Sequence, residues 1–147
     1  MNIIEQMSKD LLQQIATIVR LNDEADNVKE MDRRVTVFMK ELEEVGKELE
    51  ISPMEAFFLT GIIVLTINEN RKNILFRDVT EELRVSNMEA ISYYKSIDAL
   101  VQKGLITRII HNEESIEEIY YNSEISVIPY FNEEYKLTKK AIDKIIK

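Results

Sequence analysis

The chain contains no cysteine and no tryptophan, and only one histidine, three glycines and two prolines among its 147 residues. Without cysteine there is no disulfide, no thiol nucleophile and no cysteine-based zinc or iron–sulfur site, and a single histidine removes most other zinc sites. The glycines stand at positions 46, 61 and 104, too far apart for a Walker loop or a dinucleotide-binding loop. No serine lies in a G-x-S-x-G motif. We therefore expect no cofactor, no metal and no catalysis in this chain.

Signals for export and membrane insertion are equally scarce. The first ten residues, MNIIEQMSKD, lack a basic segment followed by an apolar stretch, so they do not resemble a secretory signal. The most apolar run, Met54 to Ile67, is shorter than the roughly 20 residues that cross a bilayer. These features predict a cytoplasmic protein with no membrane partner.

Acidic residues outnumber basic ones, 27 to 19, which gives a formal net charge of −8. No segment is basic enough to be a DNA-binding arm or a polybasic membrane patch. With 45% hydrophobic residues, the chain can bury a core of its own. We expect residues 1–51 to form a helical extension and residues 52–147 to form the main domain.

The predicted extension consists of two amphipathic helices. The first has an apolar stripe at Ile4, Met7, Leu11, Ile15 and Ile18, and an acidic, polar turn follows it. The second predicted helix has a heptad seam, made of Val28, Met31, Val35, Phe38, Leu42, Val45 and Leu49. Two alternatives explain the seam: an antiparallel hairpin with the first helix, or a coiled-coil-like homodimer.

A new helix is predicted to begin at Ser52, where Ser-Pro-Met-Glu supplies an N-cap and a proline in the first turn. The residues that follow are almost all apolar up to Ile67, so this should be the central buried helix. Gly61 is expected to permit the close approach of another helix. Residues 74–76 are predicted to form a short strand.

Residues 75–106 read as two helices joined by a tight turn. Val79 and Leu83 repeat at helical spacing, and Ser86 with Glu89 forms a capping box that starts the second helix, expected to span residues 87–103. Gly104 stands where a left-handed cap ends a helix, and residues 105–110 are β-like. Further β-like runs, residues 116–121 and 125–131, precede a last helix that Thr138 can cap. This order predicts a mainly α fold with a small β wing, in outline a winged helix-turn-helix preceded by a two-helix extension.

These residues resemble the bacterial winged-helix families. Val85-Ser86 and Leu100 with Gly104-Leu105-Ile106 match the family pattern, and residues 135–138, YKLT, resemble the segment that closes the wing in MarR-like regulators. A second resemblance, over residues 52–106, is to N-terminal winged-helix modules of bacterial AAA+ ATPases. The resemblances imply recognition of DNA or of protein. In contrast to MarR-like proteins, only one short helix follows residue 137.

DNA recognition would depend on the predicted recognition helix and the wing. The candidate nucleic-acid contacts are Asn87, Ser92, Tyr93, Lys95, Lys103 and Arg108. However, residues 109–135 contain seven glutamates and neither lysine nor arginine, so a wing there would be repelled by phosphates. We expect DNA binding to be weak.

The same acidic segment is rich in aromatic residues, which suit contact with a protein because they bury a large area at low entropic cost. The alternative is that the rings cover the helices of this chain. The candidate protein-contact residues are Tyr120, Tyr121, Tyr130, Phe131, Glu113 and Glu117. His111 and the neighbouring glutamates are expected to form a solvated turn, not a base or a cation site. The sequence thus favours a non-catalytic recognition module for a protein partner or a downstream domain, with a DNA-binding transcription regulator as the alternative.

Overall fold

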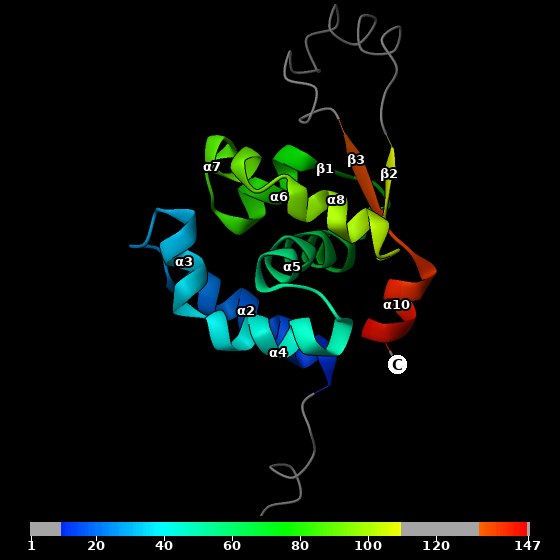
Figure 1. The fold of residues 1–147 in the computed structure, drawn as a ribbon, viewed down its shortest axis with the longest axis horizontal. Helices are drawn as coiled ribbons and strands as arrows, with labels where there is room; N and C mark the ends of the chain where they lie inside the picture. The colour runs from blue at the N-terminus through cyan, green and yellow to red at the C-terminus, as the bar shows by residue number, and fades with distance from the viewer. Residues whose placement is uncertain (1–9, 110–132, 147) are drawn as a thin grey trace, which may run out of the picture.

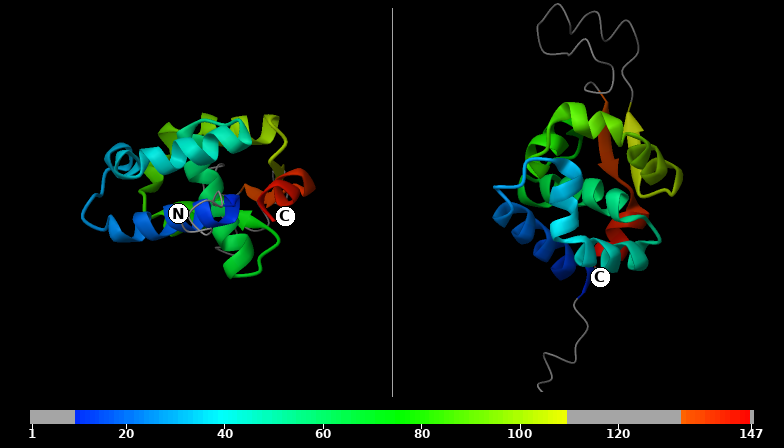
Figure 2. Two further views of the ribbon diagram at one scale, coloured as in Figure 1. Left: turned by 90° about the horizontal axis from the view of Figure 1, so that it is seen from below. Right: turned by 60° about the vertical axis from the view of Figure 1, so that its left-hand side comes forward.

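A computed structural model describes residues 10–109 and 133–146 of the chain. The described part is mainly helical, with one small three-stranded antiparallel sheet. Helix α5 (Pro53–Asn68) lies in the middle, with α2 (Leu11–Glu24), α3 (Met31–Val37) and α4 (Met39–Leu49) on one side of it. Helices α6 (Phe76–Leu83), α7 (Asn87–Ser92) and α8 (Lys95–Gln102) lie on the other side, and α10 (Lys139–Ile145) packs beside α2 (Figures 1 and 2).

The central helix forms as its sequence predicts. The hydroxyl of Ser52 accepts a hydrogen bond from the amide of Glu55, and Pro53 stands in the first turn. Ten consecutive residues, from Ala56 to Leu65, are buried. A Cβ at Gly61 would lie only 3.0 Å from side-chain atoms of Val79 and Leu83, so α6 crosses α5 closely and a larger residue here would require these side chains to shift.

The sheet has the order β1–β3–β2. Strand β1 (Ile74–Leu75) and strand β2 (Ile106–Ile109) both pair with β3 (Glu134–Leu137), with Ile74 and Arg108 opposite Tyr135 on its two sides. The predicted first strand is one residue shorter than expected, because Phe76 already belongs to α6. Gly104 has φ +74° and ends the preceding helical segment, and Thr138 caps α10 through the amide of Ala141, both as predicted.

For the second helix of the extension, the prediction of a buried seam is right from Met31 onwards, but the prediction of one continuous helix is wrong. Val28 is only half-buried and lies before the helix, which starts at Met31. The helix breaks at Phe38, where the backbone has φ −124° and ψ 34°. Three β-branched residues, at positions 35–37, precede the break and lower helix propensity. The turn lets the buried Phe38 ring pack 5.7 Å from the Phe57 ring of α5.

The predicted recognition helix over residues 87–103 is also interrupted. Helix α7 ends at Ser92, Tyr93 and Tyr94 form the break, and α8 starts at Lys95. At the break, the Tyr94 ring lies 6.0 Å from that of Phe76, so packing against α6 fixes the position of this turn.

One apolar core joins the regions on both sides of residue 51. It contains side chains from α2, α4 and α5 as well as from α6, α8, the sheet and α10. The six seam residues from Met31 to Leu49 are all at most 3% exposed inside this single chain, the packing expected for the intrachain alternative.

Candidate functional site

The first four candidate nucleic-acid contacts lie on α7, in the break after it and at the start of α8. The Ser86 hydroxyl accepts from the Glu89 amide over 3.1 Å, which fixes the start of the helix. The Glu89 carboxylate also accepts from the Met31 amide over 2.7 Å, so the same residue holds the start of α3 against α7. Four exposed residues follow one another along this segment: Asn87 and Ser92 of α7, Tyr93 of the break and Lys95 at the start of α8.

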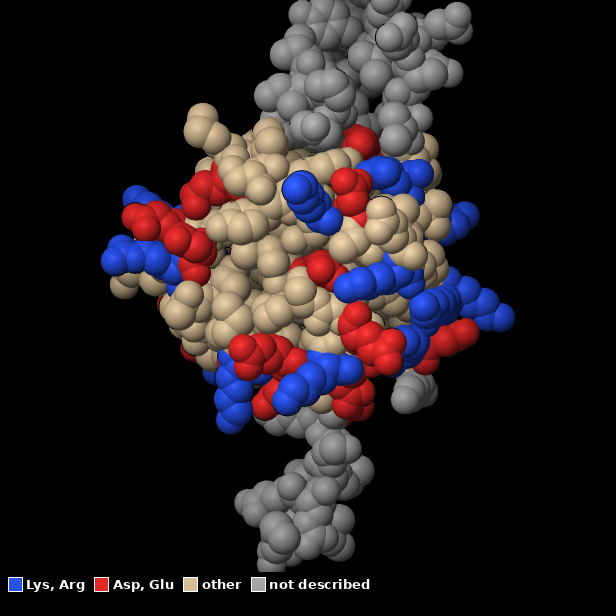
Figure 3. Space-filling view, viewed as in Figure 1, with Lys and Arg blue, Asp and Glu red and all other residues tan. Residues whose placement is uncertain are grey.

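The most exposed large apolar side chain among the described residues also belongs to α7. Met88 is 83% exposed, and Tyr93 at the end of the helix is 36% exposed. Met88 is the second residue of α7, after the N-cap Ser86 and Asn87, and no sequence motif marked it as a contact residue. In the view of Figure 3 the upper left of the surface, over α7, is mostly uncharged, whereas charged side chains gather at the left edge, along the lower part and on the right-hand half.

The other two candidate nucleic-acid contacts have partners within the protein. Lys103 Nζ lies 2.6 Å from Glu55 Oε1, which joins the end of α8 to the start of α5. Arg108 of β2 donates to the carboxylate of Asp98 and, over 3.1 Å, to the hydroxyl of Tyr94. Both cations are therefore already paired with carboxylates.

The two ion pairs shift the pKa values of Glu55 and Arg108. Burial alone would raise the pKa of the Glu55 carboxyl, but hydrogen bonds from Lys103 and Ser52 outweigh it and place that pKa below its usual value. The hydrogen bond to Asp98 raises the pKa of the Arg108 guanidinium. The pair with Asp98 thus favours the charged form of Arg108.

A buried carboxylate lies where the chain enters β3. Glu133 is only 7% exposed and accepts hydrogen bonds from the hydroxyls of Tyr94 and Tyr135, the latter over 2.8 Å. Burial, followed by the hydrogen bond and charge of Glu133, raises the pKa of Tyr94, and burial with the charge of Glu133 raises that of Tyr135. Glu133, which the sequence showed only as one of the seven glutamates in residues 109–135, thus ties the α7–α8 break to the sheet.

The candidate protein-contact residues, Tyr120, Tyr121, Tyr130, Phe131, Glu113 and Glu117, lie outside the described residues, as do His111 and the β-like runs between positions 110 and 132. Their role stays a prediction. Tyr135, counted with the same aromatic residues in the sequence, is fully buried between its neighbouring strands. For this ring the alternative of core packing is confirmed.

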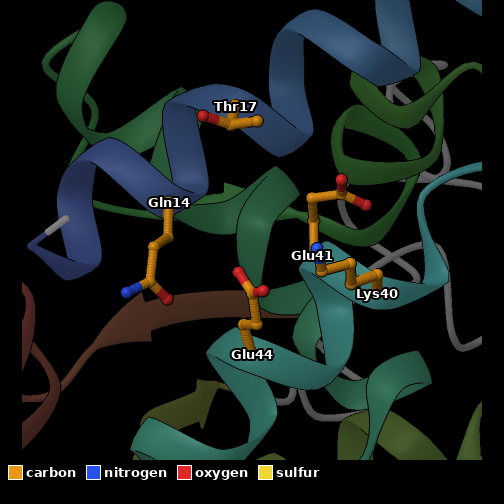
Figure 4. Close-up of a pocket in the computed structure, with 5 residues that line it drawn as sticks. All are labelled: Gln14, Thr17, Lys40, Glu41 and Glu44. Carbon is orange, nitrogen blue, oxygen red and sulfur yellow. The ribbon is translucent and has the colours of Figure 1, made fainter. Parts of the chain in front are cut away.

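A polar cleft of about 360 Å³ lies between α2 and α4. Its lining residues are Gln14, Thr17, Lys40, Glu41 and Glu44. In Figure 4 the side chains of Gln14 and Glu44 extend from the two helices into the space between them. Ligand pockets are mostly apolar with a few convergent polar groups, whereas every residue that lines this cleft is polar or charged. We regard it as a solvated furrow between packed helices.

The described residues contain neither a cluster of metal ligands nor a single helix suited to crossing a membrane. No cluster of three or more histidine, aspartate or glutamate side chains could hold a metal ion there. No helix among residues 10–109 and 133–146 has both the length and the apolarity to cross a bilayer by itself; only α4 and α5 taken together reach these limits, and they meet at 85°.

Comparison of the chain with protein-family models, with curated proteins and with solved structures found no match.

Proposed function

We propose that this protein is a non-catalytic winged-helix recognition module whose partner is another protein. The order β1–α6–α7–α8–β2–β3 and the sheet order β1–β3–β2 support the winged-helix assignment, because a helix-turn-helix followed by an antiparallel hairpin is the arrangement that the sequence resemblance implies. The fold alone does not decide between protein and DNA as the partner.

The surface around α7 has few unpaired cations and exposes apolar side chains, and this supports a protein as the partner. Of the three cations expected on the DNA-facing side, Lys103 and Arg108 are paired with carboxylates. Phosphate neutralisation by free lysine and arginine supplies most non-specific DNA affinity, so this surface has little to offer a duplex. Met88 and Tyr93 instead expose apolar area, and methionine and tyrosine are enriched at protein interfaces.

A DNA-binding regulator is the second candidate function. One observation favours it: Lys95 is exposed at the start of α8, and within residues 10–109 and 133–146 it has no carboxylate at ion-pair distance. With Asn87 and Ser92 it could contact bases or phosphates. One cation gives a small salt dependence, whereas specific DNA-binding proteins neutralise several phosphates.

A titration of labelled random duplex at two salt concentrations tests the choice. We expect a dissociation constant no tighter than about 10⁻⁴ M at physiological salt. A variant with Glu113, Glu114, Glu117 and Glu118 all changed to glutamine should bind more tightly if the acidic segment repels phosphate. Sub-micromolar binding by the unmodified protein, with a steep salt dependence, would overturn the proposal in favour of the regulator.

A complementary experiment identifies a partner by affinity capture and then titrates it, purified, against the chain. Met88→Glu should weaken binding about tenfold or more, because a charge would be placed in an apolar contact. Val37→Glu is the matched control, since Val37 is another exposed aliphatic residue, 56% exposed, on α3. Equal losses in both variants would show that α7 is not the contact surface.

The proposal includes one more specific form, a module that regulates an AAA+ ATPase domain. It is supported only by the sequence resemblance over residues 52–106. Mixing this chain with an ATPase domain from the same genome should then change its ATP turnover, and the Met88→Glu variant should change it less.

A further inference from the structure

A second surface, separate from α7, has the features of a binding site. A cleft of about 190 Å³ opens where the end of α5, the loop before β1, strand β3 and helix α10 meet. Three of the residues that line it are cationic, Arg71, Lys72 and Lys136, and none is acidic. We call it the basic cleft. On a protein with a net charge of −8, such a concentration of one sign is a local exception.

The charges of the basic cleft are only partly neutralised. Arg71 Nη2 lies 2.7 Å from Asp78 Oδ2, an ion pair that orients the guanidinium and uses one of its five N–H groups. Lys72 and Lys136 are exposed, and among the described residues neither has a carboxylate at ion-pair distance. The ammonium groups of Lys72 and Lys136 and the ion-paired guanidinium of Arg71 therefore border the same small cleft.

The basic cleft also has an apolar wall. Leu137 of β3 and Ile142 of α10 line it, and Ile142 is 40% exposed. Asn70, with φ +51°, turns the chain sharply after α5, so that the two cations that follow it lie beside this wall. The cleft thus places positive charge next to aliphatic surface within the space of a few side chains.

We propose that the basic cleft binds an acidic segment of a protein partner, in which a carboxylate side chain neighbours an aliphatic or aromatic one. The carboxylate would lie between Lys72 and Lys136, and the apolar side chain against Ile142. A free phosphate would use the cations but not the wall, and a duplex needs a longer row of cations than three. The acidic remainder of the surface repels such a segment, so the field of the protein directs it to this cleft. The inference rests on the proposed function and names one partner class for it.

The test uses the full chain and a dye-labelled hexapeptide of alternating glutamate and leucine, followed by fluorescence anisotropy. We expect saturable binding that weakens about tenfold or more in the double variant Lys72→Glu/Lys136→Glu. Ile142→Ser should weaken it as well, because the apolar contact is lost. The charge-matched control is Lys40→Glu/Lys47→Glu, which makes the same change on exposed positions of α4 and should bind like the unmodified protein. Circular dichroism verifies that all variants are folded.

Two comparisons make the result decisive. Hexapeptides of alternating glutamine and leucine, or glutamate and serine, should bind at least about tenfold more weakly than the first peptide. Equal affinity for either peptide, equal loss in the α4 control, or displacement of the peptide by millimolar inorganic phosphate or by duplex DNA would overturn the cleft proposal. If the peptide does not bind and duplex binding is also weak, only the cleft proposal is overturned. If the duplex binds tightly, the proposed function is overturned.

Discussion

The side-chain amide of Asn22 in α2 donates a hydrogen bond to the main-chain carbonyl of Leu83, at the end of α6, over 3.1 Å. Its amide oxygen accepts from Arg34 Nη1 over 2.9 Å, and Arg34 also donates to the Asn22 carbonyl over 2.8 Å. Asn22 and Arg34 are 4% and 2% exposed. A buried polar contact therefore links the N-terminal helices to the end of α6, at the place where the sequence predicted only a polar turn.

Asn22→Ala should lower the free energy of unfolding by about 1–3 kcal/mol, because it leaves the Leu83 carbonyl and part of the Arg34 guanidinium buried without a partner. Burial, and then the nearby Arg84, already lower the pKa of Arg34, so this cation is sensitive to any lost acceptor. Urea unfolding followed by circular dichroism measures the change. Asn73→Ala, at an exposed loop position, should change stability by less than about 0.5 kcal/mol. Equal effects would mean that the contact does not hold the two regions together.

The capping serines give a second prediction. Ser52 and Ser86 each accept a hydrogen bond from a main-chain amide three residues later, at 3.2 and 3.1 Å. Replacing either serine by alanine should lower stability by about 1 kcal/mol, since an amide in the first turn loses its acceptor. Ser92→Ala is the control, because this hydroxyl donates within its helix and caps nothing. A thermal melt of Ser86→Ala that coincides with that of the unmodified protein would place the start of α7 elsewhere.

The buried seam leads to a third prediction. Leu42 is fully buried among the helices of one chain, so Leu42→Asp should cost several kcal/mol and unfold the protein or its N-terminal helices. Sedimentation separates this from the homodimer alternative: stability and mass of the unmodified protein should not depend on its concentration. A concentration-dependent dimer that Leu42→Asp abolishes while leaving the helical content unchanged would show that the seam joins two chains.

The features that the sequence predicted well are those set by a few neighbouring residues. The caps at Ser52, Ser86 and Thr138 each depend on atoms three positions apart, and the left-handed Gly104 depends on a single residue. Helical periodicity likewise identified the buried face of the extension, because burial of a stripe requires only that some apolar surface lies opposite it.

The features that it missed depend on contacts between distant positions. The break at Tyr94 is held by Glu133, 39 positions away, and Lys103 is paired with Glu55, 48 positions away. A local pattern shows Lys103 only as a cation on a helix and Glu133 only as one of several acids. The sequence therefore suggested more unpaired positive charge on the candidate DNA surface than the structure has. The exposed Met88 on the same surface was not recognised.

The last prediction concerns two glutamates whose pKa values shift in opposite directions. For Glu55 the folded-state pKa is below the unfolded value, so its charged form stabilises the fold above about pH 4.3, and this contribution is lost as the pH falls through the folded pKa. Burial, with the nearby charges of Asp23 and Glu69, raises the pKa of Glu82, so its charged form destabilises the fold and protonation relieves the effect.

At pH 7, Glu55→Gln should therefore reduce the free energy of unfolding by up to about 1 kcal/mol, and Glu82→Gln should leave it equal or slightly higher. Both differences should shrink as the pH falls, that of Glu82→Gln first, because its folded-state pKa is the higher of the two. Urea unfolding at several pH values between 7 and 3 measures them, with Glu43→Gln, at an exposed position of α4, as the control. A Glu55→Gln protein that loses no stability at neutral pH would show that Lys103 is not held by this carboxylate and is available to a phosphate, which would strengthen the DNA-binding alternative.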